Sequence, residues 1–281
     1  MVRKKILLTG SSGYLGSIIF NKLKKKYNVI KYSNQNDLKL DNNNNFAILH
    51  LAALDKKSCE SDSKLAHKVN VNLTKKIVAL GVKKKFKKVI FFSSIHVYGD
   101  HKLQCNEKNS LKPTNVYGVT KKKAEECCIN FSKKIDIIVF RISNVVAKPI
   151  KENKQSKNLL INYLCKSLYK KNVLINSNGL DVRDFVSLNY LMACLNFFLN
   201  SKNKGVYNIC SGNSIRIKDI AFKIISIFKK KYDLNNKIIF GDIKIDKFDL
   251  KFSNKKIKKL VPIQNKHSIY MEIDRIIGGF N

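Results

Sequence analysis

One short segment, Thr9-Gly10-Ser11-Ser12-Gly13-Tyr14-Leu15-Gly16, limits the fold of this chain more than any other. It follows an apolar run at residues 5–9 and precedes residues 14–26, whose apolar side chains recur at helical spacing. A buried strand, a glycine turn and a helix in this order are typical of a dinucleotide-binding fold. The first glycine allows the tight bend, the second lets the backbone approach a diphosphate, and the third lets helix and strand pack closely.

The start of this helix is the predicted site for the diphosphate, because a helix N-terminus presents N–H groups to an anion. The predicted cofactor contacts are Gly10, Ser12, Gly13, Tyr14, Leu15 and Gly16. We expect the cofactor to be NAD or NADP. In many NAD-binding proteins a carboxylate at the end of the second strand repels a 2′-phosphate. This chain has Tyr32-Ser33-Asn34 there, with Lys31 beside them, which permits NADP and favours it slightly.

Strand and helix patterns alternate along the first half of the chain. Short apolar runs predict strands at 28–32, 46–52, 88–93 and 135–140, and helical spacing predicts helices at 66–80 and 117–131. Strands that are apolar on both faces indicate an α/β fold with a doubly wound parallel Rossmann sheet. The second half predicts helices at 159–169 and 217–230, and strands at 206–209 and 237–240.

This pattern predicts two parts. A dinucleotide-binding domain covers 1–150, and 180–210 return to it. A small C-terminal substrate-binding lobe takes 151–179 and 211–281.

Ser94, Tyr117 and Lys121 form the predicted catalytic group. Ser94 follows the strand at 88–93, and the two later residues are four apart at the start of a helix, which puts them on one face. A tyrosine hydroxyl with an ordinary pKa near 10 must exchange a proton near neutral pH, and a nearby ammonium lowers that pKa. A serine at the strand end can hydrogen-bond the substrate oxygen. The alternative is an exposed helical pair, since Tyr and Lys four residues apart often occur by chance.

The joint order of several motifs is more specific than any one of them. They are TGSSGYLG at 9–16, HLAAL at 50–54, FFSSIHVYGD at 91–100, PTNVYGVTK at 113–121, FRISNVVAKP at 140–149, DVRDFVSLNYL at 181–191 and GVYNICSG at 205–212. Taken together, the chain resembles the extended short-chain dehydrogenase/reductases, the sugar-nucleotide epimerase/dehydratase group.

The resemblance implies roles for individual residues. Ser94, Tyr117 and Lys121 correspond to the family's catalytic Ser/Thr, Tyr and Lys. Lys121 would also reach the nicotinamide ribose. The remaining implied contacts are Ala52, Ala53 and Ser93 with the cofactor, Asn144 with cofactor and substrate, and Arg183 with the diphosphate of a nucleotide-linked sugar.

Two departures from the family pattern narrow the expected activity. Family dehydratases carry Thr-Asp-Glu where this chain has Ser94-Ile95-His96, so a 4,6-dehydratase is not expected. A late Arg-Pro-Gly-Asp stretch of epimerases is replaced by Phe248-Asp249-Leu250-Lys251. We therefore expect an epimerase or a 4-ketoreductase acting on a nucleotide-linked sugar. The alternative is a non-catalytic Rossmann protein that senses a dinucleotide or docks a partner.

His96 is the most unusual residue near the predicted catalytic group. It lies two residues after Ser94, where family dehydratases place a glutamate base and some epimerase-reductases a cysteine acid. An imidazole can do the same proton work near neutral pH. We therefore count His96 among the catalytic and substrate-binding candidates, together with the alternative that it only lines the pocket.

The formal charge of +35 suggests a nucleic-acid partner, yet only five of the 55 basic residues are arginine. Nucleic-acid readout favours arginine, so we expect no nucleic-acid partner and interpret the lysines as a solvated surface that attracts anionic substrates.

Seven irregularly spaced cysteines fit a reducing compartment and argue against a disulfide framework or a metal site. No apolar stretch is long enough to span a bilayer. We expect a cytoplasmic homodimer with no membrane association.

Overall fold

The computed structural model describes residues 3–33, 40–99, 104–151, 154–243 and 251–280. The chain forms two compact units. The first comprises residues 1–100, 107–142 and 195–208, and the second comprises 101–106, 143–194 and 209–281. The expected boundaries were 150 for the dinucleotide-binding part and 180–210 for its returning segment. In the structure the first unit ends at 142, and only 195–208 of the returning segment belong to it.

A six-stranded sheet forms the centre of the first unit, counted over the described residues. The strands, in spatial order, are β2 Asn28–Lys31, β1 Lys5–Thr9, β3 Asn45–His50, β4 Lys88–Ser94, β5 Asp136–Ile142 and β9 Gly205–Ile209. The neighbours from β2 to β5 pair in parallel. Every residue of β1, β3 and β4 is buried, which is why these segments are apolar on both faces. The predicted α/β Rossmann class is confirmed.

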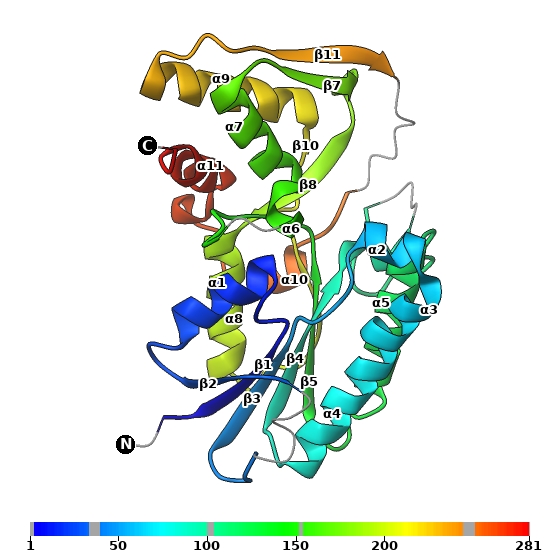
Figure 1. Ribbon diagram of the computed structural model, residues 1–281. Coiled ribbons are helices and arrows are strands. Elements are labelled where there is room, and N and C mark those ends of the chain that lie inside the picture. The colour runs from blue at the N-terminus through cyan, green and yellow to red at the C-terminus, as the bar shows by residue number, and fades with distance from the viewer. Residues whose placement is uncertain (1–2, 34–39, 100–103, 152–153, 244–250, 281) are drawn as a thin grey trace. The chain divides into compact units, whose positions relative to one another are not determined.

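Helices cover both faces of this sheet (Figure 1). Helix α1 lies on one face, and α4 and α5 lie side by side on the other. The helices of this unit are α1 Tyr14–Leu23, α2 Lys56–Ser61, α3 Ser63–His67, α4 Leu73–Lys83 and α5 Val116–Ile129. Apolar side chains of α4 and α5, such as Ile77, Val78 and Ala124, pack against the sheet in one buried cluster.

The helix predicted at 66–80 is not continuous. A π-helical turn at Lys68–Asn72 separates α3 from α4. Within it the carbonyl of Asn70 accepts a hydrogen bond from the Thr74 hydroxyl at 2.7 Å, so a side chain takes part in the helical hydrogen bonding. Such π turns are frequent at functional sites, and this one contributes Asn70 to the interior of the unit.

The second unit contains two small sheets and a helical core. Its strands are β6 Asn144–Val146, β7 Val173–Ser177, β8 Val182–Ser187, β10 Ser214–Arg216 and β11 Ile238–Ile243. Its helices are α6 Lys154–Lys157, α7 Leu160–Lys170, α9 Ile217–Tyr232, α10 Lys255–Lys258 and α11 Ile269–Ile277. Helix α8 Leu188–Asn200 belongs to this unit up to residue 194 and to the first unit from 195. Helices α7, α9 and α11 pack around one apolar cluster that includes Leu164, Ile224 and Ile273.

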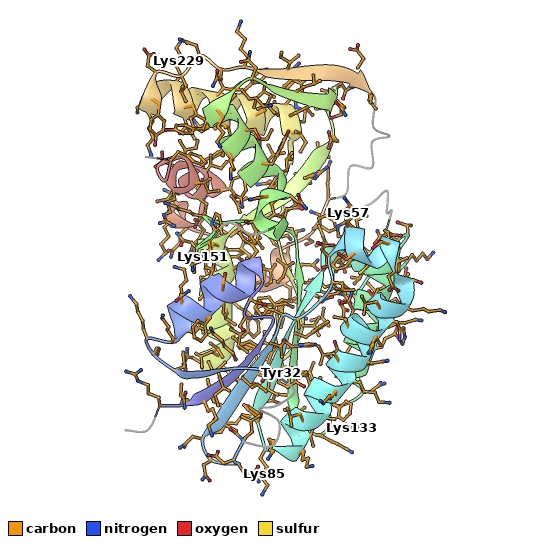
Figure 2. The ribbon with its side chains drawn as sticks, in the orientation of Figure 1. Tyr32, Lys57, Lys85, Lys133, Lys151 and Lys229 are labelled. Atoms are coloured by element: carbon orange, nitrogen blue, oxygen red, sulfur yellow. The ribbon has the colours of Figure 1, made fainter. Side chains whose placement is uncertain are left out.

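Lysines dominate the surface of both units (Figure 2). Lys57, Lys85, Lys133, Lys151 and Lys229, which the figure labels, are all exposed. Among the described residues, no helix has both the length and the apolar character needed to cross a bilayer.

Candidate active site

The glycine turn brings the ends of β1 and β3 into close contact. Gly10 has φ +69°, a left-handed conformation that favours glycine, and a Cβ there would lie 2.7 Å from the Ala52 nitrogen. A Cβ on Gly16 would lie 2.0 Å from the Gly10 carbonyl oxygen. Gly13 is the N-cap of α1, and its N–H donates to the Gly10 carbonyl at 3.0 Å. The close packing of this turn against the loop after β3 and within itself therefore requires glycine at positions 10 and 16.

The other predicted cofactor residues surround this turn. Ser12 is exposed and Leu15 is half-buried, whereas Tyr14 is buried at the start of α1. Ala52 and Ala53 are half-buried in the loop after β3, and the Ala52 N–H donates to the Thr9 hydroxyl at 3.0 Å. Tyr32, labelled in Figure 2, is half-buried and its N–H donates to the Leu8 carbonyl at 2.8 Å. Asn34 lies outside the described residues.

Ser94, Tyr117 and Lys121 come together in the first unit. Ser94 is the last residue of β4, and its side chain hydrogen-bonds the Tyr117 hydroxyl. Asn115 caps α5 by accepting from the Gly118 N–H at 2.8 Å, which fixes the first turn of the helix that carries Tyr117. Lys121 is only 2% exposed, and its ammonium donates to the Phe92 carbonyl at 2.5 Å and lies 4.2 Å from the Phe91 ring centre.

The pKa of Tyr117 differs from the sequence-based expectation. Burial of the ring raises the pKa of Tyr117 to about 12, although the Ser94 hydrogen bond opposes this. Burial lowers the pKa of Lys121 to about 8, with the Glu125 carboxylate opposing that shift. Desolvation dominates the pKa of Tyr117 in this structure and the Lys121 ammonium is bound to a backbone carbonyl, so the expected lowering of that pKa by Lys121 stays a prediction. Tyr117 is a phenol here, and therefore a proton donor.

His96 lies beside Tyr117. It is exposed in the 3₁₀ turn Ile95–Val97, and its ring contacts that of Tyr117 edge to face, with 5.7 Å between ring centres. Its backbone N–H donates to the Ser94 hydroxyl at 3.3 Å. His96 is thus placed to meet the same ligand as Ser94 and Tyr117.

Ser93, a predicted cofactor residue, has its hydroxyl bound to a buried ion pair. Its hydroxyl donates to the Glu125 carboxylate at 2.5 Å, and Glu125 forms an ion pair with Arg141 at 2.8 Å. Both charged side chains are at most 5% exposed. Neither Glu125 nor Arg141 was among the residues predicted from the sequence to form the site. Glu125 follows Lys121 by four residues on the same helical face, which is the signal that could have revealed it.

Asn144 and Arg183 belong to the second unit, on the neighbouring strands β6 and β8. The Asn144 amide donates to the Asp184 carbonyl at 2.8 Å, which ties the two strands together beside Arg183. Arg183 is 46% exposed and lies 3.5 Å from Asp181. The carboxylate of Asp184 is buried and accepts from the backbone N–H groups of Ser211 and Gly212. Arg183 therefore makes only a loose ion pair and presents its guanidinium to solvent.

Solved structures share this fold. UDP-N-acetylglucosamine 4-epimerase from Methanobrevibacter ruminantium M1, in complex with UDP-N-acetylmuramic acid, matches with a TM-score of 0.85 at 19% identity, covering 100% of this chain and 99% of that one. RMD from Pseudomonas aeruginosa, complexed with NADPH, matches with a TM-score of 0.82 at 18% identity and 98% coverage of both chains.

Matches to related sequences show the family, whereas the matches to solved structures show only the fold. An ADP-L-glycero-D-manno-heptose-6-epimerase of Brachyspira hyodysenteriae is 26% identical over 264 residues, which cover 80% of this chain and 81% of that protein. A dTDP-D-glucose 4,6-dehydratase of Dictyostelium discoideum is 29% identical over 161 residues, which are 51% of this chain and only 36% of that protein. The profile of the NAD dependent epimerase/dehydratase family matches residues 6–210. Because this match spans well over half of the chain, the protein belongs to that family.

Proposed function

We propose that this protein is an NAD(P)-dependent epimerase or 4-ketoreductase acting on a nucleotide-linked sugar. The observation that carries the proposal is the grouping of Ser94, Tyr117 and Lys121 in the unit that also holds the glycine turn. The turn has the tight strand-to-helix geometry expected of a dinucleotide site, because a side chain at Gly10 would strike the Ala52 backbone and one at Gly16 would strike the Gly10 carbonyl. The NADPH bound by the RMD relative and the uncharged Tyr32-Ser33 pair are compatible with NAD or NADP.

The nicotinamide of a bound cofactor would accept a hydride from the sugar carbon or return one to it. Tyr117 would exchange the proton of the same sugar hydroxyl at its phenolic oxygen, while Ser94 holds the sugar oxygen by a hydrogen bond. Because burial raises the pKa of Tyr117, its hydroxyl stays protonated near neutral pH and could supply the proton when a ketone is reduced. Lys121 would lie at the nicotinamide ribose, where its ammonium opposes the effect of burial on Tyr117.

Ser94 and His96 would meet the sugar, and Asn144 would contact cofactor and substrate. Arg183 would bind the nucleotide diphosphate, and its 46% exposed side chain and loose ion pair leave it free to do so. A 4,6-dehydratase is not proposed, although one relative carries that name. Neither Ile95 nor His96 supplies the acidic pair that such an elimination uses in the family.

The first test identifies the cofactor and then removes the phenol. Absorbance and mass of the copurified dinucleotide should reveal NAD or NADP, and a cofactor retained through purification favours the epimerase. Tyr117→Phe should abolish turnover of the nucleotide sugar and leave dinucleotide binding in place. Turnover by Tyr117→Phe at the rate of the wild type would refute the mechanism. Dinucleotide binding without turnover of any nucleotide sugar would instead favour a non-catalytic sensor.

A second test concerns the diphosphate contact. Arg183→Ala should raise the KM for the nucleotide sugar about tenfold or more, and it should change the dissociation constant of the dinucleotide far less. Asp181→Asn, which removes the ion-pair partner without removing the guanidinium, is the matched control and should leave that KM near the wild-type value. Equal weakening of both ligands by Arg183→Ala would contradict the assignment.

We also propose a homodimer, which the resemblance implies through the helix that carries Tyr117 and the preceding long helix. Apolar side chains of α4 such as Ile77 and Val78 lie in the protein's own core. The proposal therefore depends on the family resemblance. Sedimentation at micromolar concentration measures it, and a monomer would refute it.

A further inference from the structure

A chain of buried polar side chains connects the glycine turn with the catalytic helix. Its members are Thr9, His50, Asn70, Thr74 and Thr120, and none of them is more than 4% exposed. They come from five elements of the first unit, namely β1, β3, the π turn, α4 and α5. Buried polar groups of this kind must all be hydrogen-bonded, so their donors and acceptors can be counted.

Every donor and acceptor of the Thr9 hydroxyl has a hydrogen-bond partner. Its hydroxyl oxygen accepts from the backbone N–H groups of Leu51 at 3.1 Å and Ala52 at 3.0 Å, which occupies both lone pairs. The third neighbour is the His50 Nδ1 at 2.7 Å. Because the Thr9 oxygen can accept nothing more, its own hydrogen points to Nδ1. Nδ1 of His50 is therefore an unprotonated acceptor.

The hydrogen bonds on the Nε2 side of the His50 ring require the same tautomer. The Thr74 hydroxyl donates to the Asn70 carbonyl at 2.7 Å, so its oxygen is left to accept. It lies 2.8 Å from the His50 Nε2, which must carry the hydrogen between them. Both neighbours thus require the neutral Nε2–H tautomer of His50.

A charged His50 does not fit this position. A hydrogen on Nδ1 would face the Thr9 oxygen, whose lone pairs are filled, and the Lys121 ammonium also faces the ring. Burial, assisted by Lys121, lowers the pKa of His50 to about 3. The ring therefore stays neutral at any pH at which the protein would work.

Asn70 extends the connection in two directions. Its side-chain oxygen accepts from the Leu54 N–H at 2.8 Å, in the loop that follows Ala52 and Ala53. Its amide donates to the Thr120 hydroxyl at 3.0 Å, and Thr120 donates to the Tyr117 carbonyl at 2.9 Å. The same residue thus holds the predicted cofactor loop and the first turn of α5.

We propose that His50 is a positioning residue, locked as the Nε2–H tautomer, that sets the cofactor loop at β1 and β3 in register with the helix that carries Tyr117. It contacts neither ligand and acts through Thr9 on one side and through Thr74 and Asn70 on the other. The role in cofactor placement rests on the proposed function. The tautomer itself rests only on the hydrogen-bond geometry.

The first experiment measures the tautomer. Protein labelled with ¹⁵N-histidine gives separate ring-nitrogen signals for protonated and unprotonated nitrogens, and His50→Asn identifies the signals of His50. The expected result is one protonated Nε2 and one unprotonated Nδ1, unchanged from about pH 5 to about pH 9. A protonated Nδ1, or titration of the ring within that range, would overturn the proposal.

The second experiment breaks the connection at one atom and then restores it. Thr74→Val keeps the shape of the side chain but leaves the His50 Nε2–H without an acceptor. The ring can regain a partner only by turning, which breaks its bond to the Thr9 hydroxyl, the group that holds the Leu51 and Ala52 N–H groups. Thr74→Val should weaken NADH or NADPH binding, measured by fluorescence titration, about tenfold, the usual scale for a buried donor left unsatisfied. Thr74→Ser should restore it.

A core variant of the same helix separates this effect from general destabilisation. Val78→Ala removes two buried methyl groups of α4 without touching the polar chain, so it should lower the melting temperature but leave dinucleotide affinity unchanged. Equal weakening by Val78→Ala, or wild-type affinity in Thr74→Val, would overturn the positioning role. If the wild-type protein bound no dinucleotide, the proposed function and the cofactor role would fail together, while the ¹⁵N measurement would still decide the tautomer.

Discussion

Burial makes the charged form of Lys121 unfavourable in the folded protein. It is 2% exposed, and burial lowers its pKa to about 8. Below that pH the folded state carries a charge that the unfolded chain solvates better. Between about pH 8 and its ordinary pKa near 10.4, the folded state has released the proton and the unfolded state still binds it, so stability rises with pH in this window. A residue retained under this strain is expected to serve function rather than stability.

Lys121→Met should therefore stabilise the protein and inactivate it. At pH 7 we expect the free energy of unfolding in urea to rise by about 1–3 kcal/mol, since a 2-unit pKa shift corresponds to about 3 kcal/mol. The gain over wild type should shrink as the pH approaches about 10.4. Lys123→Met, at an exposed position of the same helix, is the control and should change little. A less stable Lys121→Met at pH 7 would show that its contacts with Phe92 and Phe91 outweigh desolvation.

A single substitution tests whether His96 transfers a proton in the reaction. Its ring contacts that of Tyr117, its backbone N–H donates to the Ser94 hydroxyl, and its side chain is exposed. If it moves a proton at a sugar carbon next to a ketone, His96→Asn should suppress incorporation of solvent deuterium into the substrate, read by mass spectrometry. Deuterium exchange and turnover both at wild-type levels would make His96 a wall residue and leave Tyr117 as the acid/base.

At the level of elements, α5 approaches the 3₁₀ turn of His96 through a glycine. A Cβ on Gly118 would lie 2.5 Å from the His96 carbonyl oxygen and 2.9 Å from the Pro113 Cβ. Backbone cannot yield as a flexible side chain can. The close approach of α5 to the strand end that carries Ser94 therefore depends on this residue.

Gly118→Ala should destabilise the protein even though alanine is the better helix former by about 1 kcal/mol. We expect a loss of about 1–3 kcal/mol in the free energy of unfolding, as for overpacking, together with reduced turnover because Tyr117 precedes it directly. Gly81→Ala in α4 is the matched control, since its Cβ would meet only the side-chain ends of Ile48, Ile135 and Val89, at 3.0 Å or more. A more stable Gly118→Ala would contradict the close packing of α5.

The whole molecule carries 55 basic and 20 acidic residues, and its labelled lysines extend into solvent (Figure 2). Such an excess of one charge opposes the compact state by self-repulsion. The same field draws anionic ligands, which agrees with a nucleotide-linked substrate. Dissolved salt screens both the self-repulsion and the attraction of anionic ligands, so both weaken as the ionic strength rises.

The melting temperature should therefore rise with NaCl. The rise should be largest between about 10 mM and about 150 mM, where the Debye length falls from about 30 Å to about 8 Å, and small above that range. Over the same interval the KM for a nucleotide sugar should increase, because the attraction is screened. A melting temperature that stays flat or falls across this interval would mean that the lysine charges do not repel one another appreciably.

Much of the fold could be predicted because the deciding signals are local. Parallel strands buried on both faces must be apolar, so β1, β3, β4 and β5 were found within two residues of their ends. The glycine spacing at 10, 13 and 16 requires a strand, a turn and a helix, and Tyr117 and Lys121 share a helical face. Helix α8 and the strands β7, β8 and β10 were not predicted, because short strands and a helix apolar over most of its length carry no clear period.

The sequence by itself determined the strands buried on both faces, the glycine turn and the shared helical face of Tyr117 and Lys121, because each depends on residues close along the chain. Only the tertiary structure decided the pairing of Glu125 with Arg141, the chain from Thr9 through His50 to Thr120, and the direction of the Tyr117 pKa shift. Those features depend on which distant side chains share an interior and on how far water is excluded from them. Burial and hydrogen-bond partners are properties of the packed molecule, and no local spacing encodes them.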